Sequence, residues 1–479
     1  MPKYDYDIGI IGAGAAGLTV ASGTSQLGAK TLLIEKEKDL GGDCLHYGCV
    51  PSKTLIRTAR VRSLMKRAGE FGLPEAGLEP VDFKKVTTRI QDVISVIQKH
   101  DSVERFCSLG VKVEFGEAGF IDSHSISLNG STVSARQWVI ATGSSPSAPN
   151  IQGLEDTPYI TNKEIFYLDS LPPSMIVLGG GPIGVELSQA MARLGTEVTL
   201  IQRSGQILSR DDRDMAEMAL AALRADGVKV YLDTDILRTE DKGTHKEVFF
   251  IQAGREHSVK AHTLLVALGR SPNSEGLRLE NAAIETGPDG WIKVDRRMRT
   301  SQRHIYAAGD ATGAFQFTHA AGYEGGIIVA NAVFHLPRKA DYTWMPHCTY
   351  IDPELAGIGL NEGQAKERGI DYSVWTEKFA DNDRALAEGE SRGRIKLLLD
   401  AKERPLGVQI FGPHSGELIN EWVAAMAGRV KPGALAGAIH PYPTLGEINK
   451  RVAGGFLSKK LFSDRVRKVL RLIFNLRGS

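Results

Sequence analysis

The apolar positions of the chain repeat one order of elements in two places far apart in the sequence. The first place has an apolar run at 8–11, a glycine-rich turn at 12–17, a helical stretch ending near Gly28, and an apolar run at 31–34 that leads to Glu35. The second has matching segments at 175–178 and 179–184, a helical stretch ending near Gly195, and a run at 197–201 that leads to Gln202. Short apolar runs around a helix-length segment predict β-α-β units. We therefore predict two such units.

Each predicted unit carries glycines with G-x-G-x-x-G spacing: Gly12, Gly14 and Gly17 in the first, Gly179, Gly181 and Gly184 in the second. In a dinucleotide-binding turn the first glycine permits a tight turn, the second lets pyrophosphate approach the backbone, and the third lets helix pack on strand. The pyrophosphate then lies at a helix N-terminus, which favours anions. Two turns in the same phase predict two dinucleotide sites, and purely structural units are the alternative.

The residue that follows the second apolar run differs between the two units. Glu35 can accept hydrogen bonds from both hydroxyls of an unphosphorylated ribose. The second unit has Gln202 at this position, followed by Arg203. Without a carboxylate to repel a 2′-phosphate, and with a guanidinium able to pair with one, the second site favours NADPH. NADH is the alternative coenzyme if Arg203 is only a solvated charge.

Two cysteines follow the first unit, in the run G-G-D-C-L-H-Y-G-C-V-P-S-K at 41–53. The thiols of Cys44 and Cys49 can close a small disulfide ring that takes up and releases two electrons. Two buried structural thiols are the alternative. Because the adjacent dinucleotide sites would supply an electron donor, the redox interpretation is favoured.

Composition narrows the class of protein. A chain of 479 residues is long enough for about three domains, and a hydrophobic fraction of 42% with a net charge of +1 is typical of a soluble globular protein. That charge gives no reason to expect a nucleic-acid partner. Four cysteines are too few for a secreted disulfide scaffold, so a reducing cytoplasm is expected. No zinc-type Cys/His spacing is present, so no metal ligands are predicted. Cys107 and Cys348 lack the context of the first pair and are expected to be buried, unreactive thiols.

The segment from Asp82 to Gly110 predicts one long surface helix. Its apolar positions at helical spacing are Phe83, Val86, Ile90, Val93 and Ile97. Packing of this stripe on the core of the first domain is a sufficient explanation for it.

Three further motifs complete a resemblance to class I pyridine nucleotide–disulphide oxidoreductases, the flavoprotein family of glutathione reductase, dihydrolipoyl dehydrogenase and mercuric reductase. They are A-T-G at 141–143, A-L-G-R-S-P-N at 267–273, and I-Y-A-A-G-D at 305–310, followed by T-H-A-A at 318–321. The resemblance extends from Tyr4 to about Glu447. It implies FAD in the first site, with contacts from Gly42, Thr142, Gly143, Asp310, His319 and Ala320, and it places Gly269 at the exit from the nicotinamide domain.

The resemblance also implies an α/β fold with two Rossmann-like dinucleotide-binding domains, for FAD and NAD(P), and a C-terminal α+β dimerisation domain. The FAD domain would consist of residues 1–150 and 273–343, on either side of an NAD(P) domain at 151–272. The dimerisation domain would span 344–458. In this family the partner's C-terminal domain completes each active site, so a homodimer with shared active sites is implied.

Roles for the residues around the cysteine pair follow from the same resemblance. Cys49 would be the flavin-side thiolate, with its pKa lowered by a position at a helix N-terminus. Cys44 would be the thiol that reacts with the acceptor. Lys53, one turn after Cys49, would lie near the flavin and pair with Glu186, which follows the second glycine turn.

The C-terminal motif departs from that of glutathione reductases and dihydrolipoyl dehydrogenases, which have a histidine before Pro-Thr and a glutamate five positions later. Here Tyr442 takes the histidine position, while Glu447 keeps the glutamate position. A tyrosine with a pKa of about 10 is a poor general base at pH 7, and His440 is the alternative base. Mercuric reductases carry tyrosine there, but this chain lacks their metal-binding module and C-terminal cysteine pair. Asp43 also replaces the usual threonine beside Cys44, where its charge disfavours the thiolate.

We therefore expect a mercuric reductase-like enzyme that passes electrons from NAD(P)H through FAD and the Cys44–Cys49 disulfide to a small disulfide, a protein-bound lipoyl group or a metal ion. A dihydrolipoyl dehydrogenase-like enzyme that oxidises a protein-bound dithiol with NAD is the alternative. A vestigial, flavin-bearing scaffold at a membrane is a third interpretation, which the intact Lys53 and Glu186 disfavour.

Residues 459–479 predict a basic amphipathic tail. Its cations are Lys459, Lys460, Arg465, Arg467, Lys468, Arg471 and Arg477, against Asp464 alone. Its apolar residues at helical spacing are Phe462, Val466, Val469, Leu470, Ile473 and Leu476. Such a helix can lie on an anionic membrane or dock on a partner, and packing on the dimer's own body is the alternative. The tail therefore predicts a second location besides the cytoplasm, at the inner face of the membrane.

Overall fold

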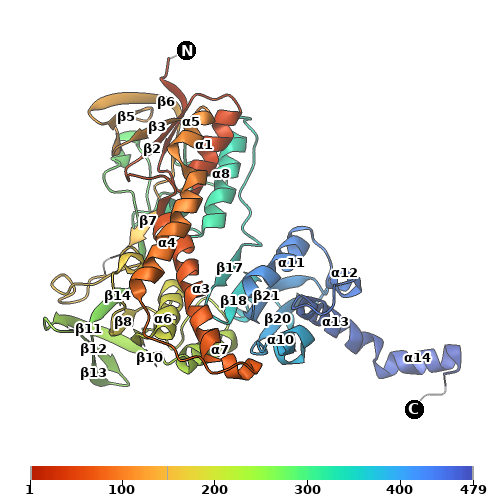
Figure 1. Cartoon of the computed structure of the whole chain (residues 1–479). Coiled ribbons are helices and arrows are strands. Elements are labelled where there is room, and N and C mark those ends of the chain that lie inside the picture. The colour runs from red at the N-terminus through yellow and green to blue at the C-terminus, as the bar shows by residue number, and fades with distance from the viewer. Residues whose placement is uncertain (1–2, 148, 477–479) are drawn as a thin grey trace.

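The computed structural model describes residues 3–147 and 149–476 (Figure 1). The first part of the chain builds a seven-stranded sheet in the order β3-β2-β1-β6-β5-β4, and β16 pairs with β6. Its strands are β1 (Tyr6–Ile11), β2 (Thr31–Glu35), β3 (Lys112–Phe115), β4 (Ala118–Phe120), β5 (Ser125–Leu128), β6 (Ser131–Ile140) and β16 (Ile305–Ala307). The apolar runs predicted as strands are therefore β1 and β2, which pair in parallel. The chain leaves this sheet after β6 and returns at β16.

Helix α1 (Ala15–Gln26) follows β1 and packs beside α8 (Thr318–Ala332) on this sheet (Figure 1). This packing is close because the helices meet at small residues: a Cβ on Gly325 would lie 3.1 Å from the Ala16 carbonyl oxygen. The N-terminus of α1 therefore comes to lie at the carboxyl end of β1, where dinucleotide sites of such sheets occur.

The second β-α-β unit lies in a separate four-stranded parallel sheet, ordered β10-β9-β8-β14. Its strands are β8 (Ser174–Leu178), β9 (Glu197–Ile201), β10 (Lys229–Tyr231) and β14 (Thr263–Val266). Helix α6 (Pro182–Leu194) connects β8 to β9, and α7 (Arg213–Ala225) connects β9 to β10. An antiparallel sheet of β11 (Thr234–Asp241), β12 (Lys246–Gln252) and β13 (Arg255–Ala261) adjoins it. The short strands β7 (Ser144–Pro146) and β15 (Arg270–Pro272) pair where the chain enters and leaves this region.

The C-terminal part builds a five-stranded antiparallel sheet in the order β17-β18-β21-β20-β19. Its strands are β17 (Pro346–Thr349), β18 (Glu354–Gly359), β19 (Tyr372–Lys378), β20 (Arg394–Asp400) and β21 (Pro405–Gly412). Helices α11 (Ser415–Ala427) and α13 (Glu447–Leu461) cover one face, where the fully buried Trp422 lies in the core between sheet and helices. The fold is the mixed α/β architecture that the sequence predicts.

The single long helix predicted over 82–110 is wrong in its extent. The structure has α4 (Phe83–Gln98), a 3-10 turn, and a separate short helix α5 (Val103–Ser108). Ser102 adopts an extended backbone and its side chain accepts a hydrogen bond from the Arg105 N–H, so it caps a new helix. Cys107 on α5 is exposed, contrary to the predicted burial, because this short helix turns Phe106 into the core instead.

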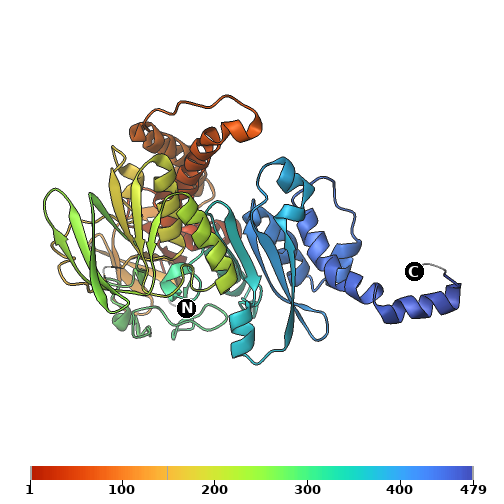
Figure 2. The ribbon, with the colours of Figure 1, turned by 90° about the horizontal axis from the view of Figure 1, so that it is seen from below.

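A last helix, α14 (Asp464–Phe474), follows α13 and extends away from the rest of the molecule in both views (Figures 1 and 2). Residues 477–479, and with them Arg477 of the predicted tail, lie outside the described residues. Along the chain that the structure describes, no helix combines the length and apolar character needed to cross a bilayer.

Candidate active site

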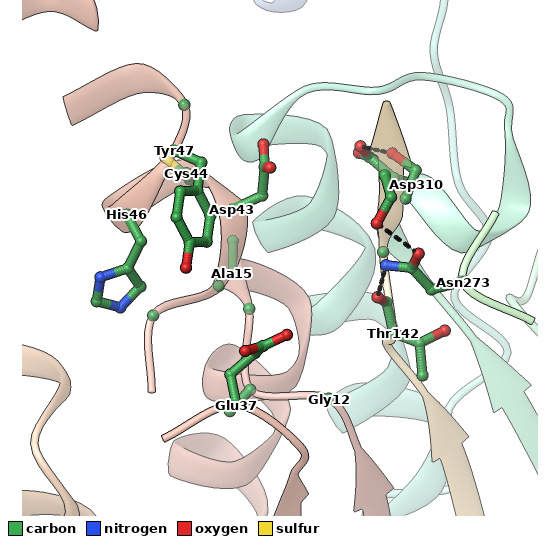
Figure 3. A pocket seen from close by; sticks show the side chains of 18 of the residues that line it. Gly12, Ala15, Glu37, Asp43, Cys44, His46, Tyr47, Thr142, Asn273 and Asp310 are labelled. Atoms are coloured by element: carbon green, nitrogen blue, oxygen red, sulfur yellow. Dashed lines mark hydrogen bonds between the residues drawn. The ribbon is translucent and has the colours of Figure 1, made fainter. Parts of the chain in front are cut away.

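A cavity of about 1150 Å³ lies at the carboxyl ends of β1 and β2. The residues that line it come from several separate segments: the first glycine turn, the strand end at Glu35, the cysteine run, the A-T-G motif, β15 and the start of α8. Figure 3 shows Asp43 and Cys44 on one side of this cavity and Asp310, Asn273 and Thr142 across from them. On that far side, the Asn273 side chain donates to the Thr142 carbonyl oxygen over 2.8 Å. The cavity therefore brings together motifs that are up to about 300 residues apart.

The first glycine turn has little room at two of its glycines and open space at the third. Gly12 has φ +102, and a Cβ there would lie 2.4 Å from the Ala141 carbonyl oxygen. A Cβ on Gly17 would lie 1.9 Å from the Gly12 carbonyl oxygen. Around Gly14, the N-cap of α1, a Cβ would meet nothing within 4 Å. The backbone N–H groups that begin α1 are thus open to the cavity.

The second glycine turn repeats this geometry. Gly179 has φ +107, and a Cβ there would lie 2.4 Å from the Ala267 carbonyl oxygen. A Cβ on Gly184 would lie 1.9 Å from the Gly179 carbonyl oxygen, and one on Gly181 would meet nothing within 4 Å. Both turns therefore leave the same opening at a helix N-terminus, where an anion is favoured.

The strand-end side chains hold the glycine turns in place. Glu35 accepts hydrogen bonds from the backbone N–H groups of Ala13, Lys36 and Glu37 over 2.7–3.0 Å. Of the roughly four lone-pair positions of a carboxylate, three are thus in use, and capacity remains for a ribose hydroxyl.

In the second unit, Gln202 accepts from the Gly180 N–H over 2.7 Å with its carbonyl oxygen. Its amide group donates to the Ser204 hydroxyl over 2.5 Å. Arg203 is exposed and pairs with no carboxylate among the described residues. Gln202 therefore performs the same tethering as Glu35 without placing a negative charge at the strand end.

The two cysteines of the predicted redox pair border the cavity as free thiols. Cys44 lies in α2 (Gly42–His46), and Cys49 begins α3 (Cys49–Lys66). A hydrogen bond from Cys44 and the nearby Lys53 cation together lower the pKa of Cys49 to about 6, against the effect of burial. The same hydrogen bond, together with burial, raises the pKa of Cys44. The pair is therefore unequal, with the thiolate on Cys49.

Three parts of the chain meet at an ion pair beside this thiolate. Lys53 on α3 lies 2.9 Å from a carboxylate oxygen of Glu186 on α6, so the pair expected from the sequence is present. The other carboxylate oxygen of Glu186 accepts from the Tyr350 N–H over 2.7 Å, and the Lys53 ammonium lies 4.5 Å from the centre of the Tyr350 ring. Burial works to lower the pKa of Lys53, but the Glu186 carboxylate outweighs it and raises that pKa. Lys53 is therefore a fixed cation.

Asp43, the unusual residue beside Cys44, is neutralised by an arginine that sequence reasoning did not single out. Arg270 on β15 lies 3.3 Å from Asp43 and 3.6 Å from Asp310. Burial raises the pKa of Asp310, while the Ser144 hydroxyl, which donates to it over 2.6 Å, works in the opposite direction. The charge of Asp43, expected to disfavour the thiolate, is thus shared with a cation.

Only some of the remaining residues predicted to contact the cofactor line the cavity. Thr142, Gly143 and Gly42 line the cavity. His319 and Ala320 lie in the first turn of α8, but Thr318 and Ala321 are the residues of that turn that line it. Thr318 also lies 3.6 Å from the Cys49 sulfur. The T-H-A-A motif located this turn, but only the rotation of the helix showed which of its side chains point inward. Gly269 lies outside the cavity lining, at the entry to β15, with φ +140.

The three candidate acid–base residues near the C-terminus do not reach the cavity of their own chain. None of His440, Tyr442 and Glu447 lines it. His440 lies 2.8 Å from a carboxylate oxygen of Glu421 on α11, a partner that the motif did not reveal. Tyr442 is exposed and donates to Asp383 over 2.9 Å. One carboxylate oxygen of Glu447 is buried without a hydrogen-bond partner.

The cavity has the features that FAD requires. Its volume matches a large ligand, and its open glycine turn offers helix N–H groups to a pyrophosphate. The Glu35 and Asp310 carboxylates both line the cavity and can accept hydrogen bonds from hydroxyl groups of a bound ligand. These donors and acceptors fit a flavin dinucleotide.

Comparison with known proteins agrees with this fit. Residues 6–325 match the pyridine nucleotide-disulphide oxidoreductase family, and residues 345–453 match the dimerisation domain of that family. A mercuric reductase of Lysinibacillus sphaericus is 36% identical over 450 residues, which cover 94% of this chain and 82% of the relative. A dihydrolipoyl dehydrogenase of Bacillus subtilis (strain 168) is 34% identical over 447 residues, covering 92% of this chain and 96% of the relative.

Among solved structures, the HOCl-induced flavoprotein disulfide reductase RclA from Escherichia coli superposes with a TM-score of 0.85 at 29% identity, covering 94% of this chain and 99% of that chain. A Cu(II) complex of RclA superposes with a TM-score of 0.84. The chain therefore belongs to the pyridine nucleotide–disulphide oxidoreductase family. It is a flavoprotein oxidoreductase whose family depends on FAD and uses NAD(P)H as coenzyme.

Proposed function

We propose that the chain is an FAD-containing, NADPH-dependent reductase that passes electrons through the Cys44–Cys49 pair to a metal ion or a disulfide. The observation that carries this proposal is the unequal thiol pair beside the Lys53–Glu186 ion pair, on a cavity that fits a flavin dinucleotide. The intact pair also argues against a vestigial scaffold. FAD, when bound, supplies two-electron transfer between a nicotinamide and sulfur.

The residues of this chain hold charge and protons for that reaction. Two electrons break the Cys44–Cys49 bond, which leaves a thiolate on Cys49 and, after uptake of one proton, a thiol on Cys44. The Lys53 ammonium stabilises the Cys49 thiolate. Glu186 holds that ammonium in place from the nicotinamide side. Cys44 is then the group that reacts with the acceptor, after it gives up its proton.

The coenzyme preference is proposed from the second strand end. Gln202 places no carboxylate there, and Arg203 has no carboxylate partner among the residues described. A guanidinium of this kind can pair with a 2′-phosphate in two parallel hydrogen bonds, whereas NADH offers only hydroxyls. NADPH is therefore the proposed coenzyme.

Similarity to mercuric reductases supports a metal-ion acceptor, and Tyr442 takes the position at which glutathione reductases have histidine. We further propose a homodimer in which the C-terminal domain, about 344–458, meets the partner's FAD domain, formed by 1–150 and 273–343 around an NAD(P) domain at 151–272. Since His440, Tyr442 and Glu447 do not reach the cavity of their own chain, this arrangement would bring them to the partner's Cys44. We place the reaction in the cytoplasm, because four cysteines are too few for the disulfide scaffold of a secreted protein.

A second candidate, a dihydrolipoyl dehydrogenase-like activity, is favoured by one contact. Glu421 lies 2.8 Å from the His440 imidazole, and a carboxylate in that position can orient a histidine as a general base. In this alternative, His440 rather than the residue before Pro-Thr would take the proton from a dithiol substrate.

The proposal is tested by reductive titration of the purified dimer. We expect uptake of four electrons per subunit, two on the flavin and two on the disulfide, with a long-wavelength thiolate-to-flavin absorbance at the halfway point. Cys49→Ser should abolish this absorbance, while Cys44→Ser should keep it. A Cys49→Ser protein that retains the absorbance would show that the two thiols are assigned the wrong way round.

The acceptor is tested by steady-state assays with Hg(II), Cu(II), glutathione disulfide, lipoamide and quinones. Metal-ion turnover that is insensitive to His440→Ala supports the first candidate. Rapid turnover of dihydrolipoamide that falls about 10²–10⁴-fold in His440→Ala supports the second. Tyr442→His provides the matched gain-of-function variant, because it restores an imidazole at the family position and should raise lipoamide turnover if Glu447 can orient it.

A further inference from the structure

The basic tail, residues 459–476, is a surface for which the oxidoreductase reaction has no use. It lies beyond both family matches, the second of which ends at residue 453. It comprises the last turn of α13 and all of α14, and no residue of α14 is buried. In Figures 1 and 2 the helix leaves the body at the far end of the dimerisation domain. Most residues of this tail are therefore exposed in the monomer, and only Ser463 and Val466 are half-buried.

The apolar face of α14 is continuous. Val466, Val469, Leu470 and Ile473 are spaced by one, three and four residues and so share one side of the helix. Phe474 continues that side, while Phe462 precedes the helix and Leu476 follows its end. Large apolar side chains here are strongly exposed: Phe462 70%, Ile473 63%, Phe474 65% and Leu476 54%. An apolar face of this size is costly to leave in water and indicates an interaction surface.

The opposite face carries the cations, together with the exposed Leu472, which lies four residues after Lys468. Arg465, Lys468 and Arg471 form no ion pair with any described residue, while Arg467 pairs with Asp464, the single carboxylate of α14. The two earlier cations are tied to the body, since Lys460 pairs with Glu403 and Lys459 lies over the Trp375 ring. Three cations without partners thus flank the apolar face, in a chain whose net charge is only +1.

We propose that α14 binds the protein to the surface of an anionic lipid bilayer. The apolar face would enter the boundary between headgroups and acyl chains, with the helix parallel to the membrane. Arg465, Lys468 and Arg471 would then meet anionic headgroups, which supply the charge that no carboxylate of the described chain supplies. A helix of 11 residues is about 16 Å long, so it lies on the membrane and does not span it. In a dimer, two such helices bind together and strengthen attachment.

The proposal goes beyond the proposed reaction, and its test needs no turnover. The FAD-loaded full chain is sedimented with phosphatidylcholine vesicles that do or do not contain phosphatidylglycerol. We expect binding only to the anionic vesicles at low ionic strength and release at about 1 M NaCl, where charge attraction is screened within about 3 Å. Failure to bind anionic vesicles at low salt overturns the proposal.

Variants separate the two faces. The triple change Arg465→Gln, Lys468→Gln and Arg471→Gln should weaken vesicle binding by roughly 100-fold, at about fivefold per cation. The matched control removes three exposed cations from the body, Arg224→Gln, Arg255→Gln and Lys293→Gln, and should leave binding unchanged. Leu470→Glu with Ile473→Glu should abolish binding through the apolar face. Equal losses in the control variant would assign binding to the body and overturn the proposal.

The alternatives to a membrane at the apolar face of α14 are a partner protein and the second subunit. Deletion of the residues after Ser458 should abolish vesicle binding while the protein stays dimeric, yellow and able to form the thiolate-to-flavin absorbance. A deletion variant that loses dimerisation, measured by sedimentation velocity, would assign the face to the second subunit and overturn the proposal. Binding of the intact protein to uncharged vesicles as well as anionic ones would also overturn it.

Discussion

The two β-α-β units share one backbone and differ at the end of the second strand. In both, the third glycine lies against the carbonyl oxygen of the first, with the same 1.9 Å to an added Cβ. In both, the strand-end side chain accepts a hydrogen bond from the second residue of the turn, Ala13 in one unit and Gly180 in the other. One has a carboxylate at this position and the other an amide. The two units thus share the geometry of the glycine turn and differ in the charge of the side chain at the strand end.

The units also differ in what they contribute to the chemistry. The first is followed directly by Cys44 and Cys49, so the thiols lie beside its cavity. The second contributes Glu186 from its helix, which reaches Lys53 in the first region. The Lys53–Glu186 ion pair therefore joins the second unit to the region of the thiol pair, and changes in either unit can be tested separately.

The largest expected effect comes from filling the third glycine of each turn. Gly17→Ala should yield protein without FAD, and Gly184→Ala should keep FAD but lose reduction by NADPH, because a methyl group would collide with a backbone oxygen in either case. Such overpacking typically costs about 1–3 kcal/mol. Flavin absorbance and stopped-flow reduction distinguish the two. Gly326→Ala on α8, where a Cβ meets nothing within 4 Å, is the control. If Gly184→Ala also loses its flavin, the two units are not independent.

Exchange of the strand-end residue in the first unit should have the next largest effect. Glu35→Gln removes one of the acceptor oxygens that now hold three backbone N–H groups. Loss of a hydrogen bond to a charged group costs about 1.5–3 kcal/mol, so FAD should bind the apoprotein roughly 10- to 150-fold more weakly. Equilibrium dialysis measures this, with Glu104→Gln on the exposed surface of α5 as the control. Unchanged affinity would show that the amide suffices in both units.

The reciprocal exchange in the second unit should change coenzyme preference. Gln202→Glu keeps an acceptor for the Gly180 N–H but places a negative charge where a 2′-phosphate would lie. We expect the ratio of kcat/KM for NADPH over that for NADH to fall by about 5- to 150-fold. This change corresponds to about 1–3 kcal/mol, the scale of one charged hydrogen bond. Arg203→Gln should weaken NADPH alone, and Arg224→Gln should change neither. Identical NADPH-to-NADH ratios in all variants would show that Arg203 does not contact the coenzyme.

The smallest effect concerns the ion pair between the units. The Cys49 thiolate has a pKa of about 6, so the thiolate-to-flavin absorbance should be present above that pH and fade as the pH falls through it. Lys53 lowers this pKa and Glu186 raises it. Lys53→Met should therefore move the midpoint up, and Glu186→Gln should move it down. Absorbance titration of the half-reduced enzyme measures both shifts, and two shifts of the same sign would contradict the electrostatic explanation.

Much of the site could be predicted because it depends on short motifs. A glycine turn between a strand and a helix has one local geometry, so Gly12 and Gly179 could be placed from spacing alone. The cysteine motif predicts Cys49 at the start of α3, and the resemblance to the family predicts the Lys53–Glu186 pair. The glycine turns and the position of Cys49 could be predicted because each depends on residues close together in the sequence.

Other contacts could not be predicted, because they join segments distant in sequence with no local pattern. Arg270 reaches Asp43 across more than two hundred residues, and Glu421 reaches His440 from a different helix. The helix predicted over 82–110 ends early because Ser102 caps a second helix, a choice that depends on local hydrogen bonds as well as apolar spacing.

The sequence by itself determined the two dinucleotide turns, the thiol pair and the amphipathic tail, because each is a periodicity or spacing within a few dozen residues. Only the tertiary structure decided which cation neutralises Asp43, and that His440 and Tyr442 lie away from their own chain's cavity. It also decided that the face of α14 is uncovered in the monomer. Electrostatics and burial depend on distances between separate segments, and these distances exist only once the chain has folded.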